Sequence, residues 1–237
     1  LAKNIQRGLL PDPLPDIQGF DLSAINISSR QVGGDYFDLI EMPNNGHILA
    51  IADVTGKGVP ASLLMANLQS MLHALAPIDV TLAEATGSIN DIIHNNTPAD
   101  KFITFFWGKI SQDRKVFKYV NAGHNPPILF RENSDEPILL EAGGVILGAM
   151  PTFLPYESDE ISIKKGDLIV FFTDGITEAL NPEQTEEYEE ERLAECIRKN
   201  RHKTAVEIQD AIIADINAFS NNIQYDDITI IVMKVEE

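Results

Sequence analysis

Two aspartates beside glycine turns are the residues of this chain best suited to metal chemistry. Asp35 stands in VGGDYFD at residues 32–38, and Asp53 stands in ADVTGKG at residues 52–58. The residues between them predict two antiparallel strands joined by a hairpin at 43–46, which would return Asp53 to the neighbourhood of Asp35. Two carboxylates about 4 Å apart repel by about 4 kcal/mol at an effective dielectric near 20, unless a cation lies between them. The pair therefore predicts half of a divalent-metal site.

Two further aspartates have the same placement near the other end of the chain. Asp174 follows the apolar run 168–172, and Asp226 precedes the apolar run 228–233. Hard cations such as Mg²⁺ and Mn²⁺ prefer carboxylate and carbonyl oxygens, and no His or Cys cluster has zinc spacing. Each aspartate alone is explained by ordinary turn or capping chemistry. The four together favour a two-metal hydrolase that activates water and needs no protein nucleophile.

The elements that must position these acids follow from the periodicity of the sequence. Strands are predicted at about 20–28, 36–41, 48–52, 102–111, 115–121, 127–131, 137–140, 157–163, 168–173 and 228–234. Helices are predicted at about 61–75, 81–95, 185–199 and 204–219. Because the strands outnumber the helices and connect mostly through short turns, the fold class is α+β with antiparallel sheet.

Composition limits the class of protein and its partners. The chain has 237 residues, of which 44% are hydrophobic, and this predicts one large globular domain. Its formal charge of -18 argues against nucleic acid and anionic membranes as partners. The single cysteine, Cys196, excludes an intrachain disulfide framework and fits a reducing, cytoplasmic setting, where it is expected to be a packing residue.

The first fifteen residues differ from the rest. Leu1, Ile5 and Leu9 have helical spacing before the proline-rich break at 11–15. We interpret 1–15 as the end of an upstream linker or regulatory helix and 16–237 as the catalytic domain. Because the sequence starts at Leu1 rather than Met, we expect a longer protein whose upstream segments carry a sensor domain or a membrane anchor.

Five motifs in order along nearly the whole chain resemble those of a known family. They are VGGDYFD at 32–38, DVTGKG at 53–58, NAGHNPP at 121–127, TDGITEA at 173–179 and DDITIIV at 226–232. This set is similar to that of the metal-dependent PPM (type 2C) protein phosphatases, and most similar to their bacterial SpoIIE/RsbU-like branch. The resemblance implies a four-layer α-β-β-α sandwich of two antiparallel sheets flanked by helices, with a dinuclear Mn²⁺ or Mg²⁺ site.

The resemblance also implies roles for single residues. Asp35 and Asp53 would be shared or bridging metal ligands and the catalytic centre, and the Val54 carbonyl would take a further ligand position. Asp174 and Asp226 would complete the coordination. Asp227 is a further candidate ligand, with a supporting or capping role as the alternative. Asp38 shares a strand face with Tyr36, not Asp35, so a structural role is favoured for it.

The candidate substrate-binding residues are Arg30 and Lys57, which lie next to the predicted metal ligands. Arg30 lies five residues before Asp35, where several family members carry an arginine that can hold the substrate phosphate; an exposed loop arginine is the alternative. Lys57 stands where many relatives carry His or Asn, so no protein general acid is assigned. For His124 a hydrogen-bonded turn is favoured over a catalytic role.

Three functions remain open from the sequence. The first is a phosphatase that hydrolyses phosphoserine or phosphothreonine on a partner protein, which the branch resemblance narrows to an anti-anti-sigma-factor-like (STAS) protein in a partner-switching pathway. The N-terminal helix would then connect a sensor to the catalytic domain and could also form a homodimer. The alternatives are a catalytically silent phosphatase-like signalling or binding domain and a two-metal hydrolase of small phosphate esters.

Overall fold

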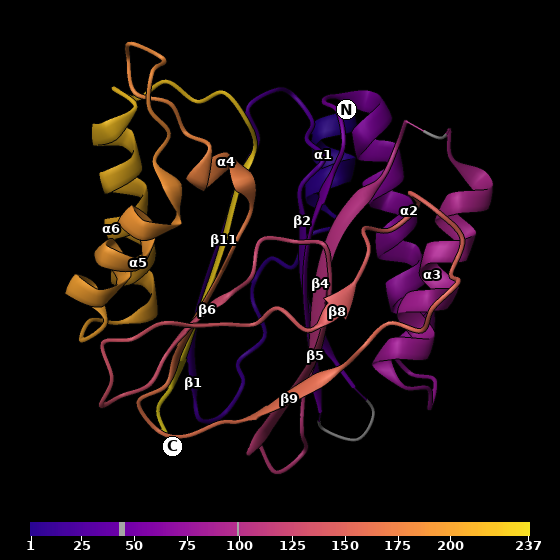
Figure 1. Cartoon of the computed structure of the whole chain (residues 1–237), viewed down its shortest axis with the longest axis horizontal. Coiled ribbons are helices and arrows are strands. Elements are labelled where there is room, and N and C mark those ends of the chain that lie inside the picture. The colour runs from indigo at the N-terminus through magenta and orange to yellow at the C-terminus, as the bar shows by residue number, and fades with distance from the viewer. Residues whose placement is uncertain (43–45, 99) are drawn as a thin grey trace. The chain divides into compact units, whose positions relative to one another are not determined.

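The computed structural model describes residues 1–42, 46–98 and 100–237, and these residues form two compact units. Unit 1 comprises Leu1–Pro15, Arg30–His124 and Glu141–Ile163. Unit 2 comprises Asp16–Ser29, Asn125–Leu140 and Lys164–Glu237. Each unit therefore consists of three separate segments of the chain and has its own sheet (Figure 1).

Unit 1 is built on the hairpin that the sequence predicts. Its sheet has the order β2-β3-β4-β5-β8, with β9 also paired to β5. The strands are β2 (Tyr36–Glu41), β3 (His47–Val54), β4 (Ile103–Ile110), β5 (Val116–Ala122), β8 (Gly143–Gly144) and β9 (Asp159–Ser162). All pairs are antiparallel except the short β5–β8 pair.

Two long helices of unit 1 lie along the same sheet (Figure 1). α2 (Val59–Leu75) buries Ala61, Met65, Leu68 and Leu72, which are spaced three and four residues apart and so share one helix face. α3 (Leu82–Asn96) starts with a capping box between Thr81 and Glu84. A short helix, α1 (Ala2–Arg7), precedes them in the chain.

Unit 2 has a five-stranded antiparallel sheet in the order β1-β11-β10-β6-β7. The strands are β1 (Phe20–Ile27), β6 (Ile128–Phe130), β7 (Ile138–Leu139), β10 (Leu168–Phe172) and β11 (Ile228–Val235). β10 and β11 are buried along almost their entire length. This central position explains why both sequences are nearly continuous apolar runs.

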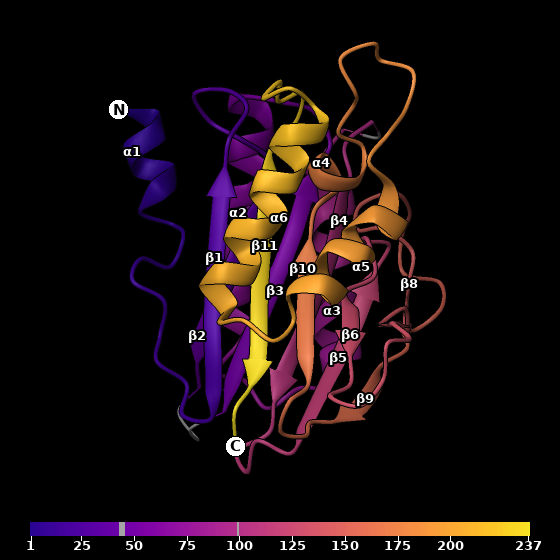
Figure 2. The same ribbon diagram turned by 90° about the vertical axis from the view of Figure 1, so that its left-hand side faces the viewer.

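The helices of unit 2 cover this sheet, as Figure 2 shows for α5 and α6. They are α4 (Asp174–Thr177), α5 (Glu189–Asn200) and α6 (Ala205–Phe219). α6 starts with a capping box between Thr204 and Glu207, and Asp21 of β1 accepts a hydrogen bond from the Ala205 N–H at 2.7 Å. Cys196 is buried in the hydrophobic core of unit 2, as predicted for a packing residue.

Most of the predicted elements are confirmed, with three differences. α5 begins at Glu189 instead of about 185, because Leu180 and Glu187 form an antiparallel bridge that occupies the preceding residues. The short elements α4 and β8 were not predicted. Of the predicted hairpin turn, residues 43–45 lie outside the described part of the chain, and the predicted boundary after residue 15 stays a prediction.

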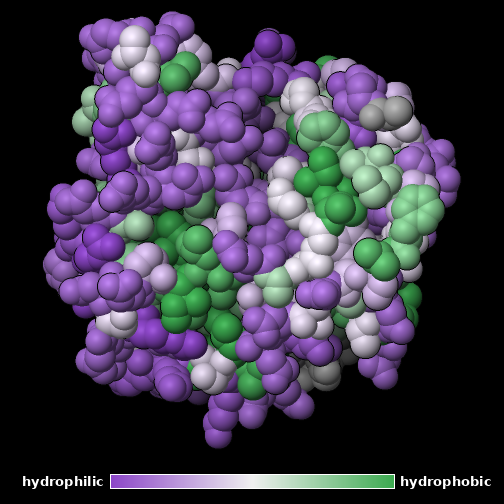
Figure 3. Space-filling model, viewed as in Figure 1, coloured by the Kyte–Doolittle hydropathy of each residue, from purple (hydrophilic) through white to green (hydrophobic). Residues whose placement is uncertain are grey.

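One apolar segment of the surface belongs to unit 1. In Figure 3 apolar side chains gather over the connection between β8 and β9, where Phe153 and Leu154 are 78% and 81% exposed. In the described residues there is no helix with both the length and the apolar character that a membrane span requires.

Candidate functional site

The first pair of acids lies at one end of the β2–β3 hairpin in unit 1. β2 and β3 pair with Tyr36 opposite Ala52, so continuing this register by one residue sets Asp35 against Asp53. Residues opposite each other on antiparallel strands have Cβ atoms about 4.5–5.5 Å apart. Asp35 is buried, with 3% of its surface exposed, and Asp53 is half-buried. The predicted return of Asp53 to the neighbourhood of Asp35 is therefore confirmed.

The residue before Asp35, Gly34, has no room for a side chain. A Cβ atom at this position would lie 2.7 Å from the carbonyl oxygen of Val54. A side chain would thus displace the same carbonyl that the motif resemblance proposes as a metal ligand. The glycine lets the chain before β2 pack against the end of β3, which keeps Asp35, Asp53 and the Val54 carbonyl in one place.

A residue of the N-terminal helix holds this loop. The side-chain amide of Gln6 donates from Nε2 to the Gly33 carbonyl at 2.7 Å, and its Oε1 accepts from the Gly33 N–H at 3.1 Å. Gln6 therefore occupies both backbone groups of the buried residue two positions before Asp35. The sequence carried no signal for this contact, because a glutamine in a short helix has no distinctive pattern.

The second set of acids lies at one end of the β10–β11 pair in unit 2. Asp174 follows β10, and Asp226 and Asp227 precede β11. Beyond the last pair of the register, Thr173 and Thr229 extend the contact: the Thr173 N–H donates to the Thr229 carbonyl at 3.1 Å, and the Thr229 N–H donates to Thr173 Oγ1 at 3.0 Å. Because the strands are antiparallel, the end of β10 lies beside the start of β11, so these acids lie at the same end of this strand pair.

Gly175 has the role in unit 2 that Gly34 has in unit 1. A Cβ atom on Gly175 would lie 1.9 Å from the Asp227 carbonyl oxygen. The chain before β11 therefore lies directly on the residue that follows Asp174. This close approach requires glycine and fixes the two strand ends that carry Asp174 and Asp226.

Asp227 has a partner within unit 2. Its Oδ1 accepts hydrogen bonds from the Ser29 N–H at 2.7 Å and from Ser29 Oγ at 2.9 Å, and its side chain is buried. These contacts tie the segment after β1 to the start of β11, which is a supporting role. Metal ligation by Asp227 stays a prediction.

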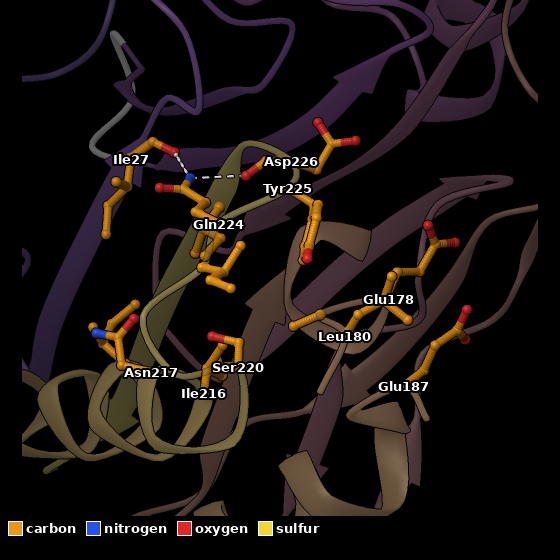
Figure 4. Close-up of a pocket in the computed structure, with 15 residues that line it drawn as sticks. Ile27, Glu178, Leu180, Glu187, Ile216, Asn217, Ser220, Gln224, Tyr225 and Asp226 are labelled. Carbon is orange, nitrogen blue, oxygen red and sulfur yellow. Dashed lines mark hydrogen bonds between the residues drawn. The ribbon is translucent and has the colours of Figure 1, made fainter. Parts of the chain in front are cut away.

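Asp226 also lines a pocket of about 360 Å³ in unit 2 (Figure 4). Glu178 and Glu187 contribute two more carboxylates to its wall. The pKa of Glu178 is raised because partial burial disfavours its ionised form and because neighbouring carboxylates repel it. These neighbours are Asp174, Glu187, Asp226 and Glu190. Glu178 belongs to the TDGITEA motif at 173–179, but it was not predicted as a site residue because no glycine or strand boundary stands directly beside it.

Asp38 has the structural role that the sequence favours. Its Oδ2 accepts a hydrogen bond from the Tyr36 hydroxyl at 2.6 Å and lies 2.7 Å from His73 Nε2. Asp38 is buried, and burial together with this carboxylate raises the pKa of Tyr36. Asp38 thus joins β2 to α2.

His124 is a hydrogen-bonded turn residue, as favoured from the sequence. Its N–H donates to Asn121 Oδ1 at 2.7 Å, its carbonyl accepts from Asn121 Nδ2 at 3.0 Å, and its Nδ1 lies 2.9 Å from Thr104 Oγ1. The predicted substrate-binding residues are both in unit 1, where Arg30 is exposed and Lys57 is half-buried.

The donor types at these two strand ends are those that a hard divalent cation prefers. Carboxylates and one carbonyl oxygen are the ligand types that Mg²⁺ and Mn²⁺ prefer, and the contacts at Gly34 and Gly175 hold them at strand ends. Asp35 and Asp53 belong to unit 1, and Asp174, Asp226 and Asp227 belong to unit 2. No group of three or more His, Cys, Asp or Glu side chains suited to a metal is found among residues 1–42, 46–98 and 100–237.

Comparison with solved structures shows the fold. The chain is similar to the SiaA-PP2C domain of Pseudomonas aeruginosa, with a TM-score of 0.83 and 21% sequence identity, over 99% of this chain and 94% of that chain. The fold is that of a PP2C domain. The predicted α+β class, with two antiparallel sheets flanked by helices, is confirmed.

Comparison with sequences defines the family. A family model described as Stage II sporulation protein E (SpoIIE) matches residues 43–236. The chain is 30% identical to phosphoserine phosphatase RsbU of Bacillus subtilis (strain 168), over 99% of this chain and 69% of that protein. It is 27% identical to phosphoserine phosphatase RsbP of the same organism, over 74% of this chain and 44% of that protein. The chain belongs to the SpoIIE family of PPM-type phosphatases, and it spans less than half the length of RsbP.

Proposed function

We propose that the chain is a metal-dependent protein serine/threonine phosphatase that hydrolyses phosphoserine or phosphothreonine on a partner protein. The observation that carries this proposal is that a glycine stands beside an acid in each unit. A side chain at either glycine would collide with a backbone carbonyl oxygen. Gly34 lies against the Val54 carbonyl beside Asp35, and Gly175 lies against the Asp227 carbonyl beside Asp174. Such close approaches position carboxylates at two strand ends, which a merely solvated acidic surface does not need.

The proposed ligand set is Asp35, Asp53, the Val54 carbonyl, Asp174 and Asp226, with Asp227 as a further candidate. These residues would hold two cations, Mn²⁺ or Mg²⁺, which when bound activate water and neutralise charge on the phosphoryl group. Among the protein groups, the carboxylates fix the cations and Arg30 would bind the phosphate through its guanidinium. Lys57, on the glycine-rich loop after Asp53, is the second candidate for phosphate contact.

The proposed substrate is a phosphorylated STAS-type protein. The same proposal gives the full-length enzyme an upstream sensor domain and places its catalytic part in the cytoplasm. Two relatives named phosphoserine phosphatases support phosphoserine as the group that is hydrolysed. A homodimer through the N-terminal helix is part of the same proposal, since Leu1, just before α1, and Ile5 of α1 are 97% and 61% exposed.

Hydrolysis of p-nitrophenyl phosphate in the presence of Mn²⁺ tests the proposal. Asp53→Asn should lose nearly all turnover while circular dichroism shows an unchanged fold, because the substitution removes one carboxylate charge from the proposed ligand set. The control is Asp113→Asn, which removes the same charge in an exposed turn. Unchanged turnover in Asp53→Asn, or faster hydrolysis of nucleotides than of a phosphoserine peptide, would contradict the proposal.

A further inference from the structure

The pocket that Asp226 lines has features that a metal site does not explain. Most of its lining is apolar, and it includes five isoleucines from three elements and from the loop before β11. These are Ile27, Ile213, Ile216, Ile223 and Ile228. A volume of about 360 Å³ is near the lower end of the range of ligand pockets, about 300–1,000 Å³, and accommodates one or two large side chains.

The rim of this pocket is acidic on one side. Glu178 and Glu187 lie on the same side, away from Asn217 and Ser220, as Figure 4 shows. Both glutamates are exposed, and no lysine or arginine is among the residues that line the pocket in the described structure. An apolar lining beside two carboxylates complements a ligand that is apolar at one end and positively charged at the other.

The wall of the pocket is held in place before any ligand arrives. Gln224 Nε2 donates to the Ile27 carbonyl and to the Asp226 carbonyl, both at 2.8 Å, which ties the end of β1 to the residues before β11 (Figure 4). The Tyr225 hydroxyl accepts a hydrogen bond from Gln184 Nε2 at 3.1 Å, which links the same wall to the segment between α4 and α5. A preformed wall lowers the entropy cost of binding.

We propose that this pocket is a docking site for a segment of the phosphoprotein substrate that inserts a large apolar side chain and sets a lysine or arginine against Glu178 and Glu187. The proposal rests on the proposed function, because Asp226 is both a candidate metal ligand and a lining residue of the pocket. Docking there would select substrates by residues outside the phosphoserine itself. The formal charge of -18 on the chain favours a basic segment in addition.

Fluorescence anisotropy with labelled peptides tests docking without catalysis. The probes are fluorescein-labelled twelve-residue peptides with a central phosphoserine, in which one leucine and one arginine are moved through the flanking positions. Binding is measured in EDTA. The best Leu/Arg peptide should bind about tenfold more tightly than its Ala/Gln counterpart, since burying a leucine side chain and pairing an exposed arginine both contribute.

Charge exchange then locates the site. Glu187→Lys should weaken binding of the best Leu/Arg peptide at least threefold and strengthen binding of the same peptide with glutamate in place of arginine. The matched control is Glu183→Lys, an exposed acid of the same segment that does not line the pocket. Ile223→Ser should weaken every leucine-containing peptide. Equal effects of Glu187→Lys and Glu183→Lys, or no preference among the peptides, would overturn the docking site.

Two further outcomes separate this proposal from its alternatives. If the peptides discriminate as expected but release no phosphate with Mn²⁺, docking holds and the proposed function fails. If p-nitrophenyl phosphate is hydrolysed while the peptides do not discriminate, the proposed function holds and docking fails. A dimer in analytical ultracentrifugation that Ile223→Ser converts to a monomer would assign the pocket to a second copy of the chain and overturn the peptide proposal.

Discussion

Gly34 and Gly175 position carboxylates by having no side chain. At neither position is φ in the left-handed region, so backbone strain does not explain these glycines. What explains them is a carbonyl oxygen: that of Val54 at Gly34 and that of Asp227 at Gly175. At Gly34, the end of β3 that carries Asp53 packs against the residue before Asp35. At Gly175, the chain that carries Asp226 and Asp227 packs against the residue after Asp174.

Substituting Gly175 tests this role. Gly175→Ala should lower the free energy of unfolding by about 1–3 kcal/mol, because the new methyl group would overlap the Asp227 carbonyl and force a backbone shift. Urea unfolding measures the change. The control is Gly87→Ala in α3, where the nearest atom to the new Cβ would be 3.5 Å away. This control should be neutral or gain up to about 1 kcal/mol from helix propensity. Comparable losses in both variants would contradict the explanation.

Glu178 predicts a pH-dependent stability. Its folded-state pKa is raised, so the ionised carboxylate is disfavoured in the folded protein; the associated stability is complete below the unfolded-state pKa and is lost as pH rises through the folded-state pKa. Glu178→Gln removes this loss. In EDTA the variant should have a higher Tm than the unsubstituted protein at pH 7.5 and the same Tm at about pH 4. A Tm difference that is independent of pH would contradict the carboxylate repulsion.

At the scale of elements, α1 is fastened to the loop before β2 through one side chain. Gln6→Leu keeps the size of the side chain but leaves both backbone groups of the buried Gly33 without this partner. An unsatisfied buried polar group costs about 1–3 kcal/mol. We expect a loss in this range by urea unfolding, together with weaker binding of Mn²⁺ by isothermal titration.

The matched control for α1 is Lys3→Leu, an exposed position of the same helix. A surface substitution of this kind changes stability by less than about 0.5 kcal/mol. If Gln6→Leu behaves in the same way as Lys3→Leu, the hydrogen bonds to Gly33 do not hold the loop.

Elements with a clear period or a capping signal were predictable, and elements made by contact were not. α3 and α6 have capping boxes, and β10 and β11 are apolar runs bounded by turn residues. β8 consists of two glycines and exists because the chain approaches β5 closely: a Cβ on Gly143 would lie 1.6 Å from the Asn121 carbonyl. No periodicity reports such an approach.

The same division holds for the candidate site. Asp35, Asp53, Asp174 and Asp226 could be predicted as candidates from the sequence because glycine turns and strand ends mark them. Gln6 was missed because its partner lies 27 residues away and the contact uses only backbone groups of Gly33. Glu178 was missed because its altered pKa depends on carboxylates that the fold gathers around it.

At the scale of the whole molecule, cation binding at the proposed ligands should stabilise the folded chain, because the unfolded chain does not hold these ligands in place. A ligand present at 100 times its Kd stabilises a folded protein by about 2.7 kcal/mol. Mn²⁺ should therefore raise the Tm, measured by differential scanning calorimetry, and either Asp53→Asn or Asp174→Asn should abolish most of this increase. A full increase in either variant would mean that its carboxylate does not bind the cation. Asp113→Asn, in an exposed turn, is the control.

The pairing of β11 has a consequence for the order in which the chain can fold during synthesis. β11 lies between β1 and β10, so the sheet of unit 2 joins a strand that begins at Phe20 to one that ends at Val235. Every strand of unit 1 has been translated by Ser162. The ribosome therefore releases all of the unit 1 sheet while β1 still lacks its neighbour, and β1 stays an unpaired edge until the final strand emerges. A nascent chain stalled before Ile228 would expose that edge to chaperones.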